Sequence, residues 1–126
     1  MRNFRNYKIW NESVNFTTEI YKIINAFPSF EKFALADQLR RASVSIASNI
    51  AEGSARESER EFAHFLSISL GSAFEVETQL QIAHNLGYIN QQLLDLLLKK
   101  IHPLERQINE LITVIKRKSQ QPKANG

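Results

Sequence analysis

The chain has no cysteine and contains only four glycines and three prolines among its 126 residues. Without cysteine it forms no disulfide, and it offers neither a thiol nucleophile nor a thiolate ligand for a metal. The scarcity of glycine and proline argues against collagen-like, low-complexity and many-stranded β folds, because β folds of that kind need frequent tight turns.

Long hydrophobic runs are also missing. The leucines of 93–98 are interrupted by Asp95, and no stretch reaches the roughly 20 consecutive apolar residues that a membrane-spanning helix requires. The basic start of the chain, residues 1–5, has no apolar run behind it and does not resemble a signal peptide. We therefore expect a cytoplasmic protein without a membrane partner.

Charge is unevenly distributed, although the formal net charge is only +3. Seven basic residues lie at the two ends without any acid: Arg2, Arg5, Lys8, Lys116, Arg117, Lys118 and Lys123. All thirteen acidic residues lie between residues 9 and 115, where only nine lysines and arginines oppose them. The body is therefore mildly acidic and both ends are basic.

Four segments repeat apolar residues at spacings of three and four, which is typical of amphipathic helices. We expect these helices over about 7–26, 29–54, 58–85 and 90–118. The short connections make successive helices antiparallel neighbours. The sequence thus predicts an all-α fold, an up-down-up-down antiparallel four-helix bundle, as one domain over residues 1–118 with a polar tail over 119–126.

Capping residues define the expected ends of these helices. Ser29 is expected to cap the second helix, and Gly53 to end it, because glycine tolerates a left-handed C-terminal cap. Ser58 and Glu61 have the spacing of a capping box at the start of the third helix. Gly87 marks the end of that helix.

Three features inside the helices carry packing predictions. Apolar residues stay in phase on both sides of Pro103, so the fourth helix should continue through it with a kink. Gly71 lies inside the third helix, where close packing would explain it. The second helix has a stripe of small residues, Ser43, Ala47 and Ala51. We expect this stripe to approach the third helix near Ser69 and Ala73.

The first helix carries two adjacent apolar seams. One seam consists of Trp10, Val14, Thr17, Tyr21 and Ile24, and the other of Ile9, Phe16, Ile20, Ile23 and Phe27. Together they are wider than a single neighbouring helix needs. We therefore expect an oligomer that buries residues of the first or fourth helix between subunits.

The search for catalytic and metal-binding motifs yields little. Residues 29–32 match S-x-x-K but lack the partner motifs of that enzyme class. Glu61 and His64 form a single Glu-x-x-His, and neither His84 nor His102 has a glutamate three residues before it. Since a di-metal bundle needs two such pairs, we expect no metal site, no cofactor and no catalytic residue.

Charged residues of the second and third helices should come close together. The antiparallel hairpin centred near residue 56 places Arg40 and Arg41 at the height of Glu75 and Glu77. Two arrangements remain open: a surface ion pair of little energetic weight, or a partly buried network that sets helix register.

The basic ends are the main functional hint from composition. In this topology Arg2, Arg5, Lys8, Lys116, Arg117 and Lys118 meet at one end of the bundle. Clustered cations bind phosphates, and the interleaved Phe4, Tyr7 and Trp10 offer surfaces for stacking on unpaired bases. The alternative is that the basic ends only confer solubility and that these aromatic side chains belong to the core.

Three segments resemble a bacterial four-helix-bundle family, the 23S ribosomal RNA intervening-sequence proteins. They are QLRRASVSIASNIAEG (38–53), EFAHFLSISLGSAFE (61–75) and LGYI (86–89), and the resemblance extends over about residues 4–115. It implies an up-down bundle that assembles as a homopentameric ring. It also implies kinship with the accessory variability protein of diversity-generating retroelements, a basic pentameric barrel that binds reverse transcriptase and nucleic acid.

The resemblance brings no catalytic residue, because none is established for the family. Its signature positions are matched by Arg40, Arg41, Asn49, Glu52, Gly53, Gly71 and Glu75, which we interpret as architectural. We expect a non-enzymatic homo-oligomer, a pentamer by resemblance, that binds RNA or a nucleoprotein through its basic end. The alternative function is a protein-protein interaction module without nucleic-acid binding.

Overall fold

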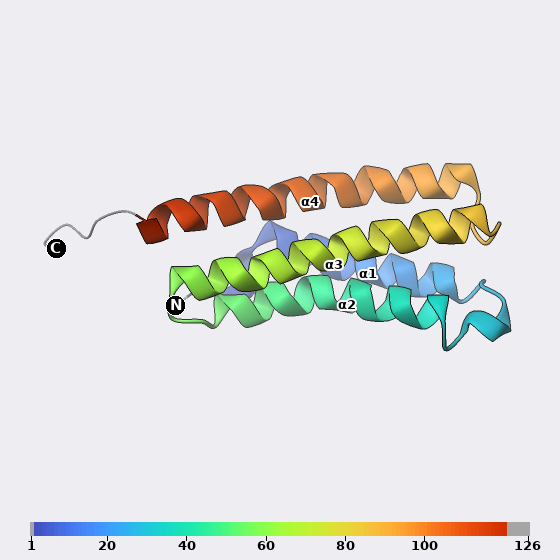
Figure 1. The fold of residues 1–126 in the computed structure, drawn as a ribbon, viewed down its shortest axis with the longest axis horizontal. Coiled ribbons are helices and arrows are strands. Elements are labelled where there is room, and N and C mark those ends of the chain that lie inside the picture. Colours follow the sequence, from blue (N-terminus) through green and yellow to red (C-terminus); the bar gives the residue numbers. More distant parts are fainter. Residues whose placement is uncertain (1, 121–126) are drawn as a thin grey trace, which may run out of the picture.

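The computed structural model describes residues 2–120. Within them the α-helices are α1 (Lys8–Ile24), α2 (Leu35–Ser54), α3 (Glu59–Asn85) and α4 (Gln91–Gln120), with short 3-10 helices η1 (Phe4–Asn6) and η2 (Ser29–Glu31). The four α-helices run alternately up and down, and the described chain contains no strand (Figure 1). The predicted all-α up-down-up-down bundle is confirmed.

The end of α4 differs from the expected boundary at residue 118. Ser119 and Gln120, the first residues of the predicted polar tail over 119–126, still belong to the helix. The remainder of that predicted tail, residues 121–126, lies outside the described residues. The helix also continues through Pro103, as the phase of its apolar residues predicted.

Helix α1 buries most of one apolar seam and only part of the other. Ile9, Phe16 and Ile20 are buried, whereas Val14 and Tyr21 of the other seam are 37% and 41% exposed. The helix packs mainly on α2 and only lightly on α4. Within the second seam Ile24 is buried and Trp10 packs against the core, so Val14 and Tyr21 are the members left at the surface of the single chain.

Helix α2 begins six residues later than the sequence predicted. Ser29 opens the 3-10 helix η2 instead of capping α2, which starts at Leu35. The N-cap position is Ala34, and the amide of Leu35 donates a hydrogen bond to Glu31 Oε1 at 3.3 Å. The other oxygen of Glu31 accepts a hydrogen bond from the Tyr88 hydroxyl at 2.8 Å, so the same carboxylate ties this start to the α3–α4 connection.

Both ends of α3 follow the sequence prediction. The Ser58 hydroxyl accepts a hydrogen bond from the Glu61 amide at 3.1 Å, as a capping box requires. At the other end Gly87 has a φ of +82°, and its amide donates to the His84 carbonyl at 2.9 Å. The amide of Tyr88 donates to the Ala83 carbonyl, which completes a Schellman motif.

The stripe of small residues on α2 does not face α3 as predicted. The backbone carbonyl of Ser43 accepts a hydrogen bond from the Thr17 hydroxyl at 2.9 Å, so this side of α2 faces α1. The α2–α3 contact is made instead by serine hydroxyls: Ser69 donates to the Ile46 carbonyl at 2.7 Å, and Ser45 bonds Ser72 at 2.7 Å. The stripe was misassigned because several faces of α2 carry small residues.

Two glycines have roles opposite to those we predicted. Gly53 has a helical backbone and does not form a left-handed cap. A Cβ at this position would lie 2.7 Å from the Cβ of Phe65 and 3.0 Å from the Phe62 ring, so Gly53 is the residue that permits close packing. At Gly71 a Cβ would meet no atom within 4 Å, and close packing within the chain does not explain that glycine.

These two glycines make a matched pair of substitutions. Gly53→Ala should lower the free energy of unfolding by about 1–3 kcal/mol, because the new methyl group overpacks the α2–α3 contact. Gly71→Ala should raise it by about 0.5–1 kcal/mol, because alanine favours the helix and meets nothing. Chemical denaturation of the two variants measures both effects, and equal effects of the two substitutions would contradict this packing.

Candidate functional site

The basic ends of the described chain lie at the same end of the bundle. The first residues of the chain and the last turns of α4 both lie at the end where α2 finishes and α3 begins (Figure 1). Arg5 and Lys8 are exposed there, as are Lys116, Arg117 and Lys118. We name these five residues the basic pole. Their gathering at one end is what the antiparallel topology predicted.

Arg2, the sixth residue assigned to nucleic-acid binding, is occupied by internal contacts. Its guanidinium pairs with Glu59, donates to the Arg56 carbonyl at 2.6 Å, and lies 4.5 Å from the centre of the Phe62 ring. Its side chain is only 17% exposed. Arg2 therefore fastens the N-terminal segment onto the α2–α3 connection, which a charge pattern alone did not reveal.

The aromatic residues near the N-terminus pack against one another and against the core. The rings of Phe4 and Trp10 are 5.0 Å apart, and those of Tyr7 and Phe62 are 5.9 Å apart. All three N-terminal aromatic side chains are half-buried. The guanidinium of Arg5 stacks on Phe4 at 4.4 Å. These contacts favour the core interpretation of the aromatics over free platforms for base stacking.

A polar groove of about 560 Å³ lies at the same end of the bundle, between α3 and α4. It is lined by Arg60, Ala63, His64, Ser67, Lys116, Ser119 and Gln120. The groove joins Lys116 of the basic pole to Arg60 and His64 of the first turns of α3. Sequence reasoning missed Arg60 as a member of this surface, although its position one turn into α3 places it at this end of the bundle.

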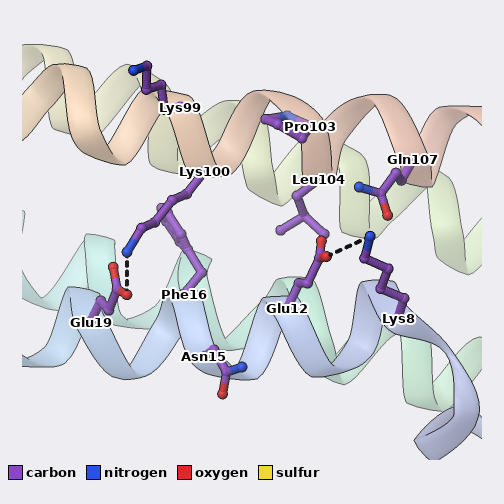
Figure 2. A pocket seen from close by; sticks show the side chains of 10 residues that line it. All are labelled: Lys8, Glu12, Asn15, Phe16, Glu19, Lys99, Lys100, Pro103, Leu104 and Gln107. Atoms are coloured by element: carbon purple, nitrogen blue, oxygen red, sulfur yellow. Dashed lines mark hydrogen bonds and ion pairs between the residues drawn. The ribbon is translucent and has the colours of Figure 1, made fainter.

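A second groove, of about 420 Å³, separates α1 from α4 (Figure 2). Phe16 and Leu104 point into it from the two helices, one ion pair crosses it from α4 to α1, and a second lies along α1. Lys100 Nζ lies 2.5 Å from Glu19 Oε1, and Lys8 Nζ lies 3.5 Å from Glu12 Oε1. Two of the three lysines that line this groove, Lys8 and Lys100, therefore have an acidic partner there.

The arginines of the predicted α2–α3 charge network bind an acid on their own helix. Arg40 and Arg41 contact the two carboxylate oxygens of Asp37 at 2.8 and 2.9 Å. The hydrogen bond from Arg40, with that from Arg41, lowers the pKa of Asp37 below its ordinary value. Asp37 sits one turn away on the same face of α2. The observed ion pairs of Arg40 and Arg41 therefore lie within α2, in place of the expected pairs with Glu75 and Glu77 of α3.

The other signature residues divide between the helix contact and the surface. The Asn49 side-chain amide donates to the Ser45 carbonyl at 2.8 Å, beside the Ser45–Ser72 hydrogen bond. Glu52, at the end of α2, pairs at 2.7 Å with Arg56 of the α2–α3 connection. Asn49 and Gly53 therefore belong to the α2–α3 contact, whereas Arg41, Glu52 and Glu75 are exposed and Gly71 is half-exposed.

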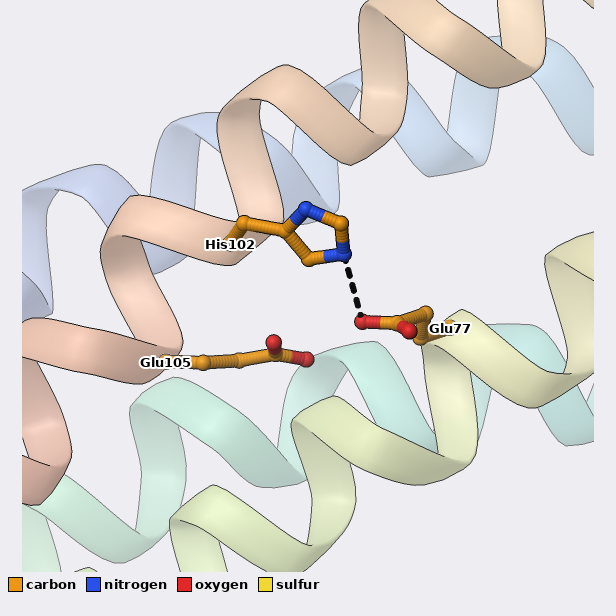
Figure 3. A group of neighbouring side chains, drawn as sticks. All are labelled: Glu77, His102 and Glu105. Carbon is orange, nitrogen blue, oxygen red and sulfur yellow. Dashed lines mark ion pairs between the residues drawn. The ribbon is translucent and has the colours of Figure 1, made fainter.

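Sequence reasoning missed a cluster formed by Glu77 of α3 with His102 and Glu105 of α4 (Figure 3). Figure 3 shows the glutamate side chains extending toward each other between the helices, with the imidazole beside them. His102 Nε2 lies 3.1 Å from Glu77 Oε1, and Glu105 is only 8% exposed. The available signal was the His-x-x-Glu spacing on one helix, the reverse of the motif that we searched for.

Within the cluster, the pKa of the Glu105 carboxyl group differs from its ordinary value. Burial, helped by a hydrogen bond and charge repulsion from Glu77, raises the pKa of Glu105 to about 8. Glu105 Oε2 has no hydrogen-bond partner within the described chain. At neutral pH the folded chain therefore keeps a proton on Glu105 that an unfolded chain releases.

This proton makes stability depend on pH with a definite sign. Because the pKa of Glu105 is raised on folding, its stabilising contribution is complete below about pH 4 and declines as the pH rises to about 8. Glu105→Gln cannot ionise, so the difference in melting temperature, variant minus wild type, should increase between pH 5 and pH 8. Thermal melts in buffer with EDTA measure this difference. Glu110→Gln is the exposed control on the same helix. A difference that stays constant between pH 5 and pH 8 would contradict the raised pKa of Glu105.

The fold and this surface define a class of protein: a four-helix bundle with exposed cations at one end. The chain belongs to the 23S rRNA-intervening sequence protein family, whose model matches residues 5–110. The resemblance drawn from the motifs is therefore confirmed.

A solved structure from Bacteroides thetaiotaomicron, a protein of unknown function from the S23 ribosomal protein family, has a similar fold. The two sequences are 26% identical, the TM-score is 0.69, and the match covers 86% of this chain and 95% of the other. No curated protein matches the chain. None of the helices between residues 2 and 120 combines the length and apolarity needed to cross a bilayer.

Proposed function

We propose that this protein is a non-enzymatic homo-oligomer of the cytoplasm that binds RNA weakly through its basic pole. The observation that carries the proposal is the convergence of Arg5, Lys8, Lys116, Arg117 and Lys118 at one end of a body that is otherwise acidic. Lys116 and its neighbours on α4 have no acidic partner in the described chain, so their charge is available to phosphates.

Oligomerisation is supported by apolar side chains that the single chain leaves at its surface. Val14 and Tyr21 are exposed on α1, and the outer face of α3 exposes Ile68, Ile82 and Leu86. Gly71 lies among the latter residues, and a Cβ there would meet no atom of the same chain within 4 Å. The family resemblance implies a ring of five, and a ring would repeat the basic pole so that individually weak phosphate contacts add together.

The RNA proposal predicts a salt-dependent affinity. The logarithm of the association constant should fall linearly with the logarithm of salt concentration, by about 0.7 for each phosphate contacted on a single strand. Changing Arg5, Lys8, Lys116, Arg117 and Lys118 to Gln should weaken binding at low salt and flatten this slope. Arg2 stays unchanged in the variant, because it holds the N-terminal segment in place. Fluorescence anisotropy with a labelled single-stranded RNA measures both quantities.

The control for this experiment removes equal charge elsewhere. It changes five exposed basic residues outside the pole to Gln, namely Lys22, Lys32, Arg41, Lys99 and Arg106. The control should keep most of the salt dependence. If both variants bind RNA equally well, or if the wild type does not bind at low salt, the exposed apolar surface favours the second candidate function, a protein-protein interaction module.

The oligomer proposal predicts a mass that is a multiple of the 14.5 kDa chain, five-fold if the ring forms as the resemblance implies. Tyr21→Lys and Ile68→Lys should each be tolerated by a monomer, because both side chains are exposed, and the one that lies at the subunit contact should dissociate the assembly. Light scattering coupled to size-exclusion chromatography gives the mass. A wild-type monomer at micromolar concentration would refute the proposal.

A further inference from the structure

We propose that Glu77, His102 and Glu105 form a binding site for a divalent transition-metal ion of the zinc class. One imidazole nitrogen and two carboxylates are ligands that such ions accept. The ligand atoms of the three residues all lie within 4.8 Å of one another, between α3 and α4 (Figure 3). No metal site was predicted from the sequence, because the Glu-x-x-His motif lies within one helix, whereas these three residues come from α3 and α4.

The geometry is close to that of a bound site. Ligand atoms that share one zinc-class ion lie about 2.0–2.2 Å from it, and so about 3–4 Å from each other. The His102 Nε2 to Glu77 Oε1 distance of 3.1 Å already satisfies this requirement. The His-x-x-Glu spacing places His102 and Glu105 on the same face of α4, one turn apart, so small rotations of the side chains bring all three ligands around one point.

Glu105 supplies an independent reason for a cation at this place. Its side chain is more than nine-tenths buried, extends toward Glu77, and its Oε2 has no hydrogen-bond partner within the described residues. A buried carboxylate without a partner is costly, and a second carboxylate beside it raises that cost further. A divalent cation bound between them neutralises both carboxylates at once.

The cluster is open on one side. The side chain of His102 is 52% exposed, so an ion can enter from solvent without any rearrangement of the helices. Three protein ligands leave at least one coordination position for water or an external group. A bound ion would join α3 to α4 near the middle of both helices, which predicts a more stable bundle in the presence of the metal.

The experiment titrates the full chain, stripped with EDTA and dialysed, with ZnCl2 by isothermal calorimetry and with CoCl2 by visible absorption. We expect one ion per chain, a higher melting temperature with zinc, and visible cobalt bands from an ordered ligand set. His102→Ala and Glu105→Gln should each weaken binding by at least about tenfold, since loss of supporting residues alone costs that much. Circular dichroism of the metal-free variants verifies that they remain folded.

Glu61 and His64 provide the matched control. They repeat a glutamate–histidine pair three residues apart on α3, but both are exposed and neither belongs to the cluster. The double variant Glu61→Gln, His64→Ala should bind zinc as the wild type does. The proposal is overturned if the stripped wild type binds neither ion at millimolar concentration, or if zinc binding survives His102→Ala and is lost in this control variant.

Discussion

The close approach of α2 and α3 is the constraint on which the rest of the bundle depends. At one end Gly53 leaves no room for even a methyl group beside Phe62 and Phe65. Further along, hydroxyl groups replace bulky side chains and donate to the facing backbone, as Ser69 does to the Ile46 carbonyl. Small residues thus shorten the distance between the helices, and hydrogen bonds satisfy the polar groups that this proximity buries.

The N-terminal segment depends on that contact directly. Arg2 reaches the backbone carbonyl of Arg56 in the α2–α3 connection, and its guanidinium lies on the ring of Phe62, whose side chain also packs beside Gly53. Any change that moves α2 from α3 therefore also moves the anchor of the first residues. One arginine assigned to the basic pole from its charge is in this way part of the core scaffold.

The fold was predictable because its signals are local and repeated. Apolar spacing, the Ser58 capping box and Gly87 at the end of α3 each depend on residues close together in the chain. The errors came from contacts between distant residues. A glycine near a helix end predicts a C-terminal cap. Only the position of Phe65 shows that Gly53 is needed because a larger side chain would not fit there. Likewise, the faces of α2 that meet α1 and α3 both carry small residues, and composition does not distinguish them.

The candidate sites also differ in whether they could be predicted from the sequence. The basic pole follows from topology, since antiparallel helices bring the two ends of the domain together, and Arg60 joins it for the same reason. The Glu77–His102–Glu105 cluster required the register of α3 against α4, which no periodicity supplies. Its most telling property, the burial of Glu105, depends on the neighbouring side chains of both helices.

Helix α1 packs only lightly on α4, so the four helix–helix contacts of the bundle are unequal. Successive helices are joined by extensive contacts, whereas the first and last helices are linked across a groove by the ion pair of Lys100 with Glu19 and by few other contacts. Helices α2, α3 and α4 therefore hold together more firmly than α1 is held to them. Local opening should begin at α1, because its departure exposes the least contact area. A subunit contact that buries the exposed side chains of α1 would hold this helix in place. Folding of α1 onto the bundle and association of the subunits would then be coupled.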